Sequence, residues 1–102
     1  MKKNRRRYLL FQLHKENGPI EAKDLSIALW RSLLSLYGEV QAADSRLYLI
    51  EFDEKDGVGI LHCNAEALPK VIASAAMIGA INDINVSFEP KKTSGTIKSL
   101  NR

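Results

Sequence analysis

Residues 47–63 read Leu-Tyr-Leu-Ile-Glu-Phe-Asp-Glu-Lys-Asp-Gly-Val-Gly-Ile-Leu-His-Cys, and they carry the clearest structural pattern in the chain. Both of its ends are rich in apolar and aromatic residues, whereas residues 53–57 are polar and end in glycine. Such a pattern is typical of a β-hairpin, in which two strands meet at a short polar turn. We therefore predict strands over 47–52 and 58–63, and the segments on either side of them determine the fold class.

One helix is predicted on each side of the hairpin. Residues 21–37 contain no glycine or proline, and apolar residues recur there at helical spacing: Ala22, Leu25, Leu29, Leu33 and Leu36. Gly38 follows as a natural C-terminal stop. Residues 64–80 form the second helix, whose regular part begins near Leu68 because the proline at position 69 fits only a first helical turn.

Two outer strands complete the pattern. Side chains alternate between two faces along residues 7–14, and apolar and polar residues alternate cleanly along 84–89, where Pro90 ends the strand. The order of the segments predicts an α+β, ferredoxin-like βαββαβ sandwich, in which two helices pack on one face of a four-stranded antiparallel sheet. The 102 residues make a single domain over 1–90, with a basic N-terminal arm at 1–7 and a basic extension at 91–102.

Positive charge is concentrated at the two ends of the chain. The net charge is only +3, but residues 1–7 and 91–102 hold nine of the 15 lysines and arginines and no acidic residue, whereas residues 8–89 hold all 12 acidic residues. Cationic ends on an acidic body are a common means of binding a polyanion such as RNA, although terminal charges that only improve solubility explain the same pattern. The candidate RNA-binding residues are Lys2, Lys3, Arg5, Arg6, Arg7, Arg46, Lys91, Lys92 and Lys98.

Three segments are more apolar than a lone domain of this fold requires. Residues 67–81 contain a single charged residue, and the first helix carries a second apolar stripe. The strand at 47–52 lies at a sheet edge in the usual strand order, yet it is apolar on both faces, with Tyr48, Ile50 and Phe52 expected on the same one. Either protein partners cover these surfaces, or each is a wide core-facing arc. The candidate interface residues are Trp30, Leu34, Tyr48, Ile50, Phe52, Ile72, Ala75 and Ile78.

No arrangement of residues predicts a catalytic or metal site. Asp53, Glu54 and Asp56 precede a glycine, but the spacing of a calcium loop fails, so we expect a solvated turn. His62 and Cys63 are neighbours in a strand and point to opposite faces, which argues against a shared metal or a Cys–His nucleophile. Because the chain has one cysteine and no apolar run of membrane-spanning length, we expect a reduced, soluble, intracellular protein.

Base stacking on the sheet is not expected. RNA-recognition sheets of this topology carry stacking aromatic residues on the third strand. Here Val58 and Ile60 occupy the corresponding positions. Any RNA contact should therefore depend mainly on charge and shape.

Five blocks, spread over nearly the whole chain, carry a family resemblance: residues 33–40, Ala42-Ala43-Asp44-Ser45, residues 47–53, residues 59–64 and Ser94-Gly95-Thr96-Ile97-Lys98. Together they are similar to the Pop-five family, the small protein component of archaeal-type ribonuclease P. The resemblance implies an RRM-like sandwich inside a ribonucleoprotein that removes the 5′ leader from precursor tRNA. It further implies a heterotetramer with two copies each of this chain and of a TIM-barrel-like ribonuclease P subunit. His62 departs from the family pattern, in which we expect arginine.

We interpret the chain as a cytoplasmic protein cofactor of an RNA-based endoribonuclease. On this interpretation the ribonuclease P RNA and its Mg²⁺ ions perform the hydrolysis, and the protein itself binds no cofactor. The subunit neutralises phosphate charge and helps to hold the catalytic RNA and the precursor tRNA in place. The alternative is a ferredoxin-like regulatory or scaffold domain that pairs with proteins and does not bind RNA.

Overall fold

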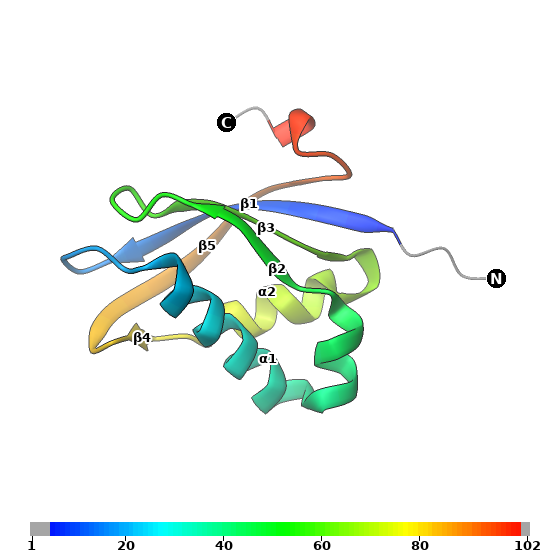
Figure 1. The fold of residues 1–102 in the computed structure, drawn as a ribbon, viewed down its shortest axis with the longest axis horizontal. Coiled ribbons are helices and arrows are strands. Elements are labelled where there is room, and N and C mark those ends of the chain that lie inside the picture. The colour runs from blue at the N-terminus through cyan, green and yellow to red at the C-terminus, as the bar shows by residue number, and fades with distance from the viewer. Residues whose placement is uncertain (1–4, 101–102) are drawn as a thin grey trace.

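A curled antiparallel sheet with two helices on one face makes up the structure, a computed structural model that describes residues 5–100 (Figure 1). Its elements are β1 (Arg6–Lys15), α1 (Ala22–Ser45), β2 (Tyr48–Phe52), β3 (Val58–Asn64), the 3₁₀ turn η1 (Ala65–Ala67), α2 (Leu68–Ala76), β4 (Ala80–Ile81), β5 (Ile84–Ser94) and the 3₁₀ turn η2 (Lys98–Leu100). The strand order is β2-β3-β1-β5-β4. The α+β class and the edge position of β2 are thus confirmed.

The sheet has five strands where the sequence predicted four. The additional strand, β4, pairs with the start of β5 across the two-residue turn Asn82-Asp83. Both turn residues have positive φ, at 51° and 66°. A tight hairpin turn needs this conformation, and asparagine and aspartate tolerate it better than other residues with a side chain.

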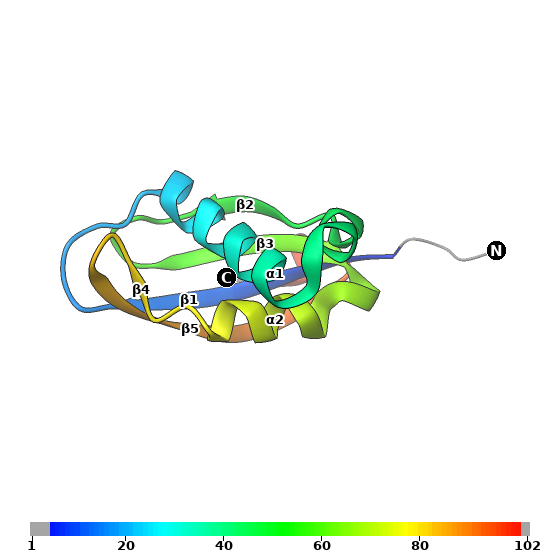
Figure 2. The same cartoon turned by 90° about the horizontal axis from the view of Figure 1, so that it is seen from below.

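The core lies between the sheet and the helices, which run side by side on the same face (Figure 2). Leucines and a phenylalanine on β1 and α1 are fully buried there: Leu9, Phe11, Leu13, Leu25, Leu29 and Leu33. The two helices are also joined by a hydrogen bond of 2.6 Å that the Ser32 hydroxyl donates to the Ser74 carbonyl oxygen.

The first helix breaks at the predicted position but does not end there. Gly38 has φ 86° and ψ 172°, which interrupts the helix, and a further helical segment continues to Ser45. Ala42 and Ser45 in this segment are buried. The segment therefore closes one end of the sandwich, and the sequence analysis did not predict it.

A β-bulge in β2 corrects the prediction for Phe52. Tyr48 pairs with His62 and Leu49 with Leu61, but the register then shifts, so that Glu51 pairs with Ile60. The extra residue, Ile50, reverses the alternation of side chains that follows it. Phe52 consequently turns toward the helices and stacks on Phe11, with ring centroids 6.1 Å apart, instead of sharing a face with Tyr48.

The prediction that Pro90 ends the last strand is wrong. β5 continues to Ser94, and a register shift between Leu10 and Phe11 lets Pro90 pair with Phe11. Because β4 pairs only with the start of β5, Pro90 lies on an edge where its missing N–H is not needed. The following η2 lies on the side of the sheet opposite the helices (Figure 1), and Leu100 and Ile60 are both fully buried. Part of the predicted extension at 91–102 is thus packed on the sheet.

Candidate functional site

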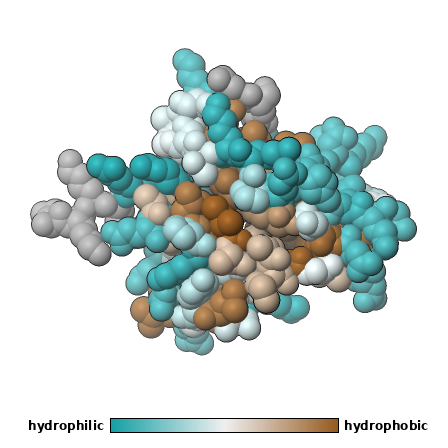
Figure 3. All heavy atoms as spheres, turned by 180° about the vertical axis from the view of Figure 1, so that it is seen from behind, coloured by the Kyte–Doolittle hydropathy of each residue, from teal (hydrophilic) through white to brown (hydrophobic). Residues whose placement is uncertain are grey.

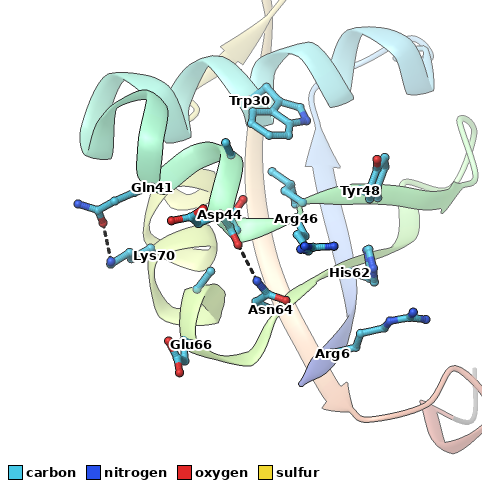
Figure 4. A pocket seen from close by; sticks show the side chains of 14 residues that line it. Arg6, Trp30, Gln41, Asp44, Arg46, Tyr48, His62, Asn64, Glu66 and Lys70 are labelled. Atoms are coloured by element: carbon cyan, nitrogen blue, oxygen red, sulfur yellow. Dashed lines mark hydrogen bonds between the residues drawn. The ribbon is translucent and has the colours of Figure 1, made fainter. Parts of the chain in front are cut away.

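A hollow of about 900 Å³ lies where α1 ends and β2 begins (Figure 4). We call it the sheet-end hollow. Charged, aromatic and amide side chains from six elements and from the turn after α1 line it: Arg6, Trp30, Gln41, Asp44, Arg46, Tyr48, His62, Asn64, Glu66 and Lys70. In Figure 4, Tyr48, His62 and Arg6 form a column along one side, and Arg46 lies between them and the end of α1.

Three of the blocks that carry the family resemblance, residues 42–45, 47–53 and 59–64, meet in this hollow. Asn64, at the end of β3, donates a side-chain hydrogen bond of 2.6 Å to the main-chain carbonyl oxygen of Asp44. Beside Asp44, the Ser45 hydroxyl donates a hydrogen bond of 2.6 Å to the Ala42 carbonyl oxygen. The Ala-Ala-Asp-Ser block therefore ends α1 and is held against the end of β3.

Arg46 follows the helix in a conformation that fits glycine better. Its φ of 53° and ψ of 43° lie in the left-handed region, at the C-cap of α1. A residue with a Cβ costs roughly 1–2 kcal/mol there, which is why glycine is the usual residue at such helix ends. The helix end itself does not require arginine at this position, and the Arg46 side chain is exposed and lines the hollow.

Among residues 5–100, three cationic side chains line the sheet-end hollow, and sequence analysis predicted two of them. Arg6 and Arg46 were candidate RNA-binding residues, whereas Lys70 was not, because it is a single charge in an apolar segment. The Lys70 ammonium donates a hydrogen bond of 2.5 Å to the Gln41 side chain and lies 5.6 Å from the centre of the Tyr37 ring. Its position facing the end of α1 follows only from the packing of the two helices.

The other candidate RNA-binding residues that the structure describes lie outside the lining of the hollow. Arg7 follows Arg6 on β1 and donates a hydrogen bond of 2.9 Å to the Arg6 carbonyl oxygen. Lys91, on β5, is 3.4 Å from the Glu89 carboxylate, so part of its charge is neutralised. The remaining described candidates, Arg5, Lys92 and Lys98, are exposed, and Lys2 and Lys3 fall outside the described residues.

Three rings form a row across β1, β3 and β2, which we call the aromatic row. The His62 ring is 5.6 Å from that of Tyr8 and 5.5 Å from that of Tyr48, measured between centroids. The three residues pair in register and face away from the helices, because Leu9, Leu61 and Leu49 beside them face the core. From the sequence, stacking rings were considered only at Val58 and Ile60. The aromatic row crosses β3 two residues after Ile60, at His62. Side-chain alternation predicts the face of the strand on which each ring lies. It does not predict the pairing register that brings the three rings side by side.

The pKa of His62 is lowered by its surroundings. Partial burial, and then the positive charge of nearby Arg6, hold the pKa of its imidazole below the usual value. Its Nδ1 atom is buried and has no hydrogen-bond partner among the described residues. A buried polar atom without a partner is uncommon and costs free energy.

The acidic residues of the hairpin turn serve the fold. The Asp53 carboxylate accepts hydrogen bonds of 2.9 Å from the main-chain N–H groups of Lys55 and Asp56, which lower its pKa. Glu54 accepts a hydrogen bond of 2.8 Å from the main-chain N–H of Ala22 and so caps α1. Within residues 5–100, no three His, Cys, Asp or Glu side chains cluster as metal ligands would, and no helix there is long and apolar enough to cross a membrane.

The candidate protein-interface residues separate into exposed and packed groups. Tyr48, Ile50 and Leu34 are exposed, and Trp30 is half-buried beside the hollow. The half-buried residues that pack against the core are Phe52, Ile72 and Ile78. On the side of α2 and β5, hydrophobic side chains gather between the C-terminal segment and the helices (Figure 3).

The prediction for Ala75 is wrong. Its side chain is fully buried in the core of this chain. The apolar side of α2 that packs on the sheet is broad enough to include Ala75, so Ala75 is not available to a partner.

Comparisons with known proteins agree on one family. The sequence profile of the Rpp14/Pop5 family matches residues 7–102. The chain is 31% identical over 100 residues to Ribonuclease P protein component 2 of Pyrococcus furiosus, which covers 98% of this chain and 82% of that protein. Its identity to the protein of the same name in Archaeoglobus fulgidus is 37%, covering 98% of this chain and 88% of that protein.

A solved structure shares the fold. A chain in the cryo-EM structure of yeast ribonuclease MRP superposes with a TM-score of 0.72 at 10% sequence identity. The superposition covers 94% of this chain and 78% of the yeast chain. At this identity the likeness concerns the fold alone.

Proposed function

Because the chain belongs to the Rpp14/Pop5 family, we propose that it is a protein subunit of ribonuclease P that binds the catalytic RNA of that enzyme. The RNA removes the 5′ leader from precursor tRNA, and the subunit holds RNA elements in place through its cations. The relatives named Ribonuclease P protein component 2 support this role.

The observation that carries the proposal is the convergence of two arginines and of residues from three family blocks on the sheet-end hollow. Arg6 and Arg46 are 40 residues apart in the sequence, yet both line it, together with Asp44 and Asn64. Arginine side chains suit phosphate groups, because the guanidinium is planar, always charged and rich in donors. The strained backbone of Arg46 supports a binding role rather than a purely structural one.

We assign the hydrolysis to the RNA and to Mg²⁺ ions held by it. Phosphodiester hydrolysis needs groups that activate water and stabilise the leaving oxygen. The carboxylates of Asp53 and Glu54, which are the densest acidic group in the chain, instead accept main-chain hydrogen bonds. This arrangement supports a subunit without an active site of its own.

A protein partner would cover exposed apolar side chains of α1 and β2. Ile27 and Leu34 are two helical turns apart on α1, and Ile50 protrudes from the bulge of β2. Exposed large apolar side chains grouped in this way are typical of protein interfaces. We propose a TIM-barrel-like ribonuclease P subunit as the partner, in a heterotetramer that also brings two copies of this chain together.

Reconstitution with the ribonuclease P RNA and the partner subunits tests the proposal. The chain should bind the RNA with an affinity that falls steeply with salt and should stimulate single-turnover cleavage of a precursor tRNA. Alanine at Asp44, Asp53, Glu54 or Asp56 should leave the cleavage rate within about tenfold, because loss of a catalytic carboxylate costs about 10² or more. A thousandfold loss in a fully assembled complex would place the active site on this chain.

The same experiment separates the alternative. A domain that only pairs with proteins would assemble with the partner subunits but would show no affinity for the RNA. Native pull-down followed by RNA sequencing would then recover no ribonuclease P RNA.

A further inference from the structure

We propose that the aromatic row stacks on unpaired bases of an RNA single strand whose phosphates contact Arg6 and Arg46 in the adjoining sheet-end hollow. This inference rests on the proposed function, because it requires that the chain bind RNA. It adds a site for single-stranded nucleotides and the residues that form it: Tyr8, His62, Tyr48, Arg6 and Arg46.

The position of the row makes its rings accessible. It crosses three adjacent strands at one level and ends at Tyr48, which is 63% exposed on the edge strand β2. η2 lies on the same side of the sheet and packs against β5. Exposed rings are costly to leave in water, whereas every nucleobase offers a flat surface on which they can stack.

The charges around the row fit the backbone of a nucleic acid. Partial burial and the charge of Arg6 lower the pKa of His62, which favours the uncharged imidazole at the centre of the row, while Arg6 and Arg46 supply the positive charge beside it. A single-strand site in which bases stack on rings needs cations beside those rings to follow the phosphates. Figure 4 shows this arrangement, with Arg6 below and Arg46 beside the His62 ring.

A single strand suits this site better than a duplex. In a double helix the bases are stacked on one another and the side chains reach mainly the backbone, whereas loops and single strands display their bases. The flat rings of the row can stack only on bases that are exposed, and along a duplex the bases are already stacked on one another. We therefore commit to an unpaired segment as the occupant.

The test uses the full chain and a labelled A- and U-rich RNA of about ten nucleotides without self-complementarity, a length typical of single-strand sites. Tyr48→Ala removes the most exposed ring, and Tyr48→Phe is the matched control that keeps it. Fluorescence anisotropy over a range of salt concentrations measures affinity, and NMR of the ring protons of His62 and Tyr48 reports stacking directly. A hairpin duplex of similar charge serves as the second RNA.

The inference requires three results. Tyr48→Ala weakens binding of the single strand by about 5- to 100-fold without changing the salt slope, because stacking releases no counterions. Tyr48→Phe stays within about twofold of the parent chain. The single strand, but not the duplex, shifts the ring protons upfield.

Equal binding by all three proteins, or equal ring shifts with duplex and single strand, would overturn the inference. If the parent chain binds folded ribonuclease P RNA with salt-dependent affinity but not the single strand, the inference fails and the proposed function stands. If it binds neither RNA, both fail. If Tyr48→Ala weakens only assembly with a protein subunit, the row is a protein contact and the inference is wrong.

Discussion

Replacement of Arg46 by glycine should stabilise the fold and weaken RNA binding at the same time. The left-handed backbone of Arg46 costs roughly 1–2 kcal/mol for a residue with a Cβ. Glycine removes this cost but loses about 0.5–1 kcal/mol through the greater freedom of the unfolded chain. The free energy of unfolding should therefore rise by about 0.5–1 kcal/mol, which for a domain of this size raises Tm by roughly 2–8 °C.

The same substitution removes one cation from the sheet-end hollow. If Arg46 contacts one phosphate, the slope of log affinity against log salt should flatten by about 0.7 to 0.9. Arg46→Gln removes the charge and keeps the strained backbone, so it should flatten the slope without raising Tm. Arg46→Lys keeps both, and its salt slope should match that of the parent chain. Calorimetry and RNA titrations at several salt concentrations measure the two effects separately.

Two outcomes would refute this reasoning. A lower Tm for Arg46→Gly would mean that the side chain stabilises the fold by packing and that the backbone strain is not the dominant effect. An unchanged salt slope in both Arg46→Gly and Arg46→Gln would mean that Arg46 does not contact phosphate.

Three further substitutions or treatments test the packing. Ala75→Glu should lower the free energy of unfolding by about 3 kcal/mol or more, because it buries an unpaired charge. Met77→Glu is the control, at a residue that is 69% exposed, and should change the free energy of unfolding by less than about 0.5 kcal/mol. Urea unfolding measures both. Gly57→Ala should destabilise the hairpin by about 1–3 kcal/mol, since φ is 79° and an added Cβ would meet a main-chain carbonyl oxygen of β1. Burial raises the pKa of Cys63 to about 11, so at pH 8 its thiol should be alkylated only on unfolding, and fast labelling of the native chain would contradict this.

Much of the fold follows from local patterns. The polar turn at 53–57 and the strands around it are where the sequence predicts them, as are the start of β5 and the break at Gly38. These features depend on the period of side-chain alternation and on residues with special backbone preferences, and both are visible without tertiary structure. The Asn82-Asp83 turn carried a similar local signal that was missed, and that signal would have predicted β4.

The errors arise where a register shift changes which way a side chain points. Tyr48 and Phe52 are four residues apart and would share a face in a regular strand, but the bulge at Ile50 separates them. Pro90 is a strand breaker only where its missing N–H would pair, and at the edge it does not. Neither outcome follows from the residues of the strand itself, because each depends on the neighbouring strand.

The sequence by itself determined the fold class, the family and the excess of positive charge at the chain ends. Periodicity, turn residues and family blocks are properties of contiguous segments, so they need no knowledge of contacts. That Arg6, Arg46, Tyr48 and His62 line one hollow, and that Ala75 belongs to the core, follows only from how the whole chain packs. The physical reason is that the register of three strands and the packing of α2 on α1 are set by the burial of the whole core, to which every segment contributes at once.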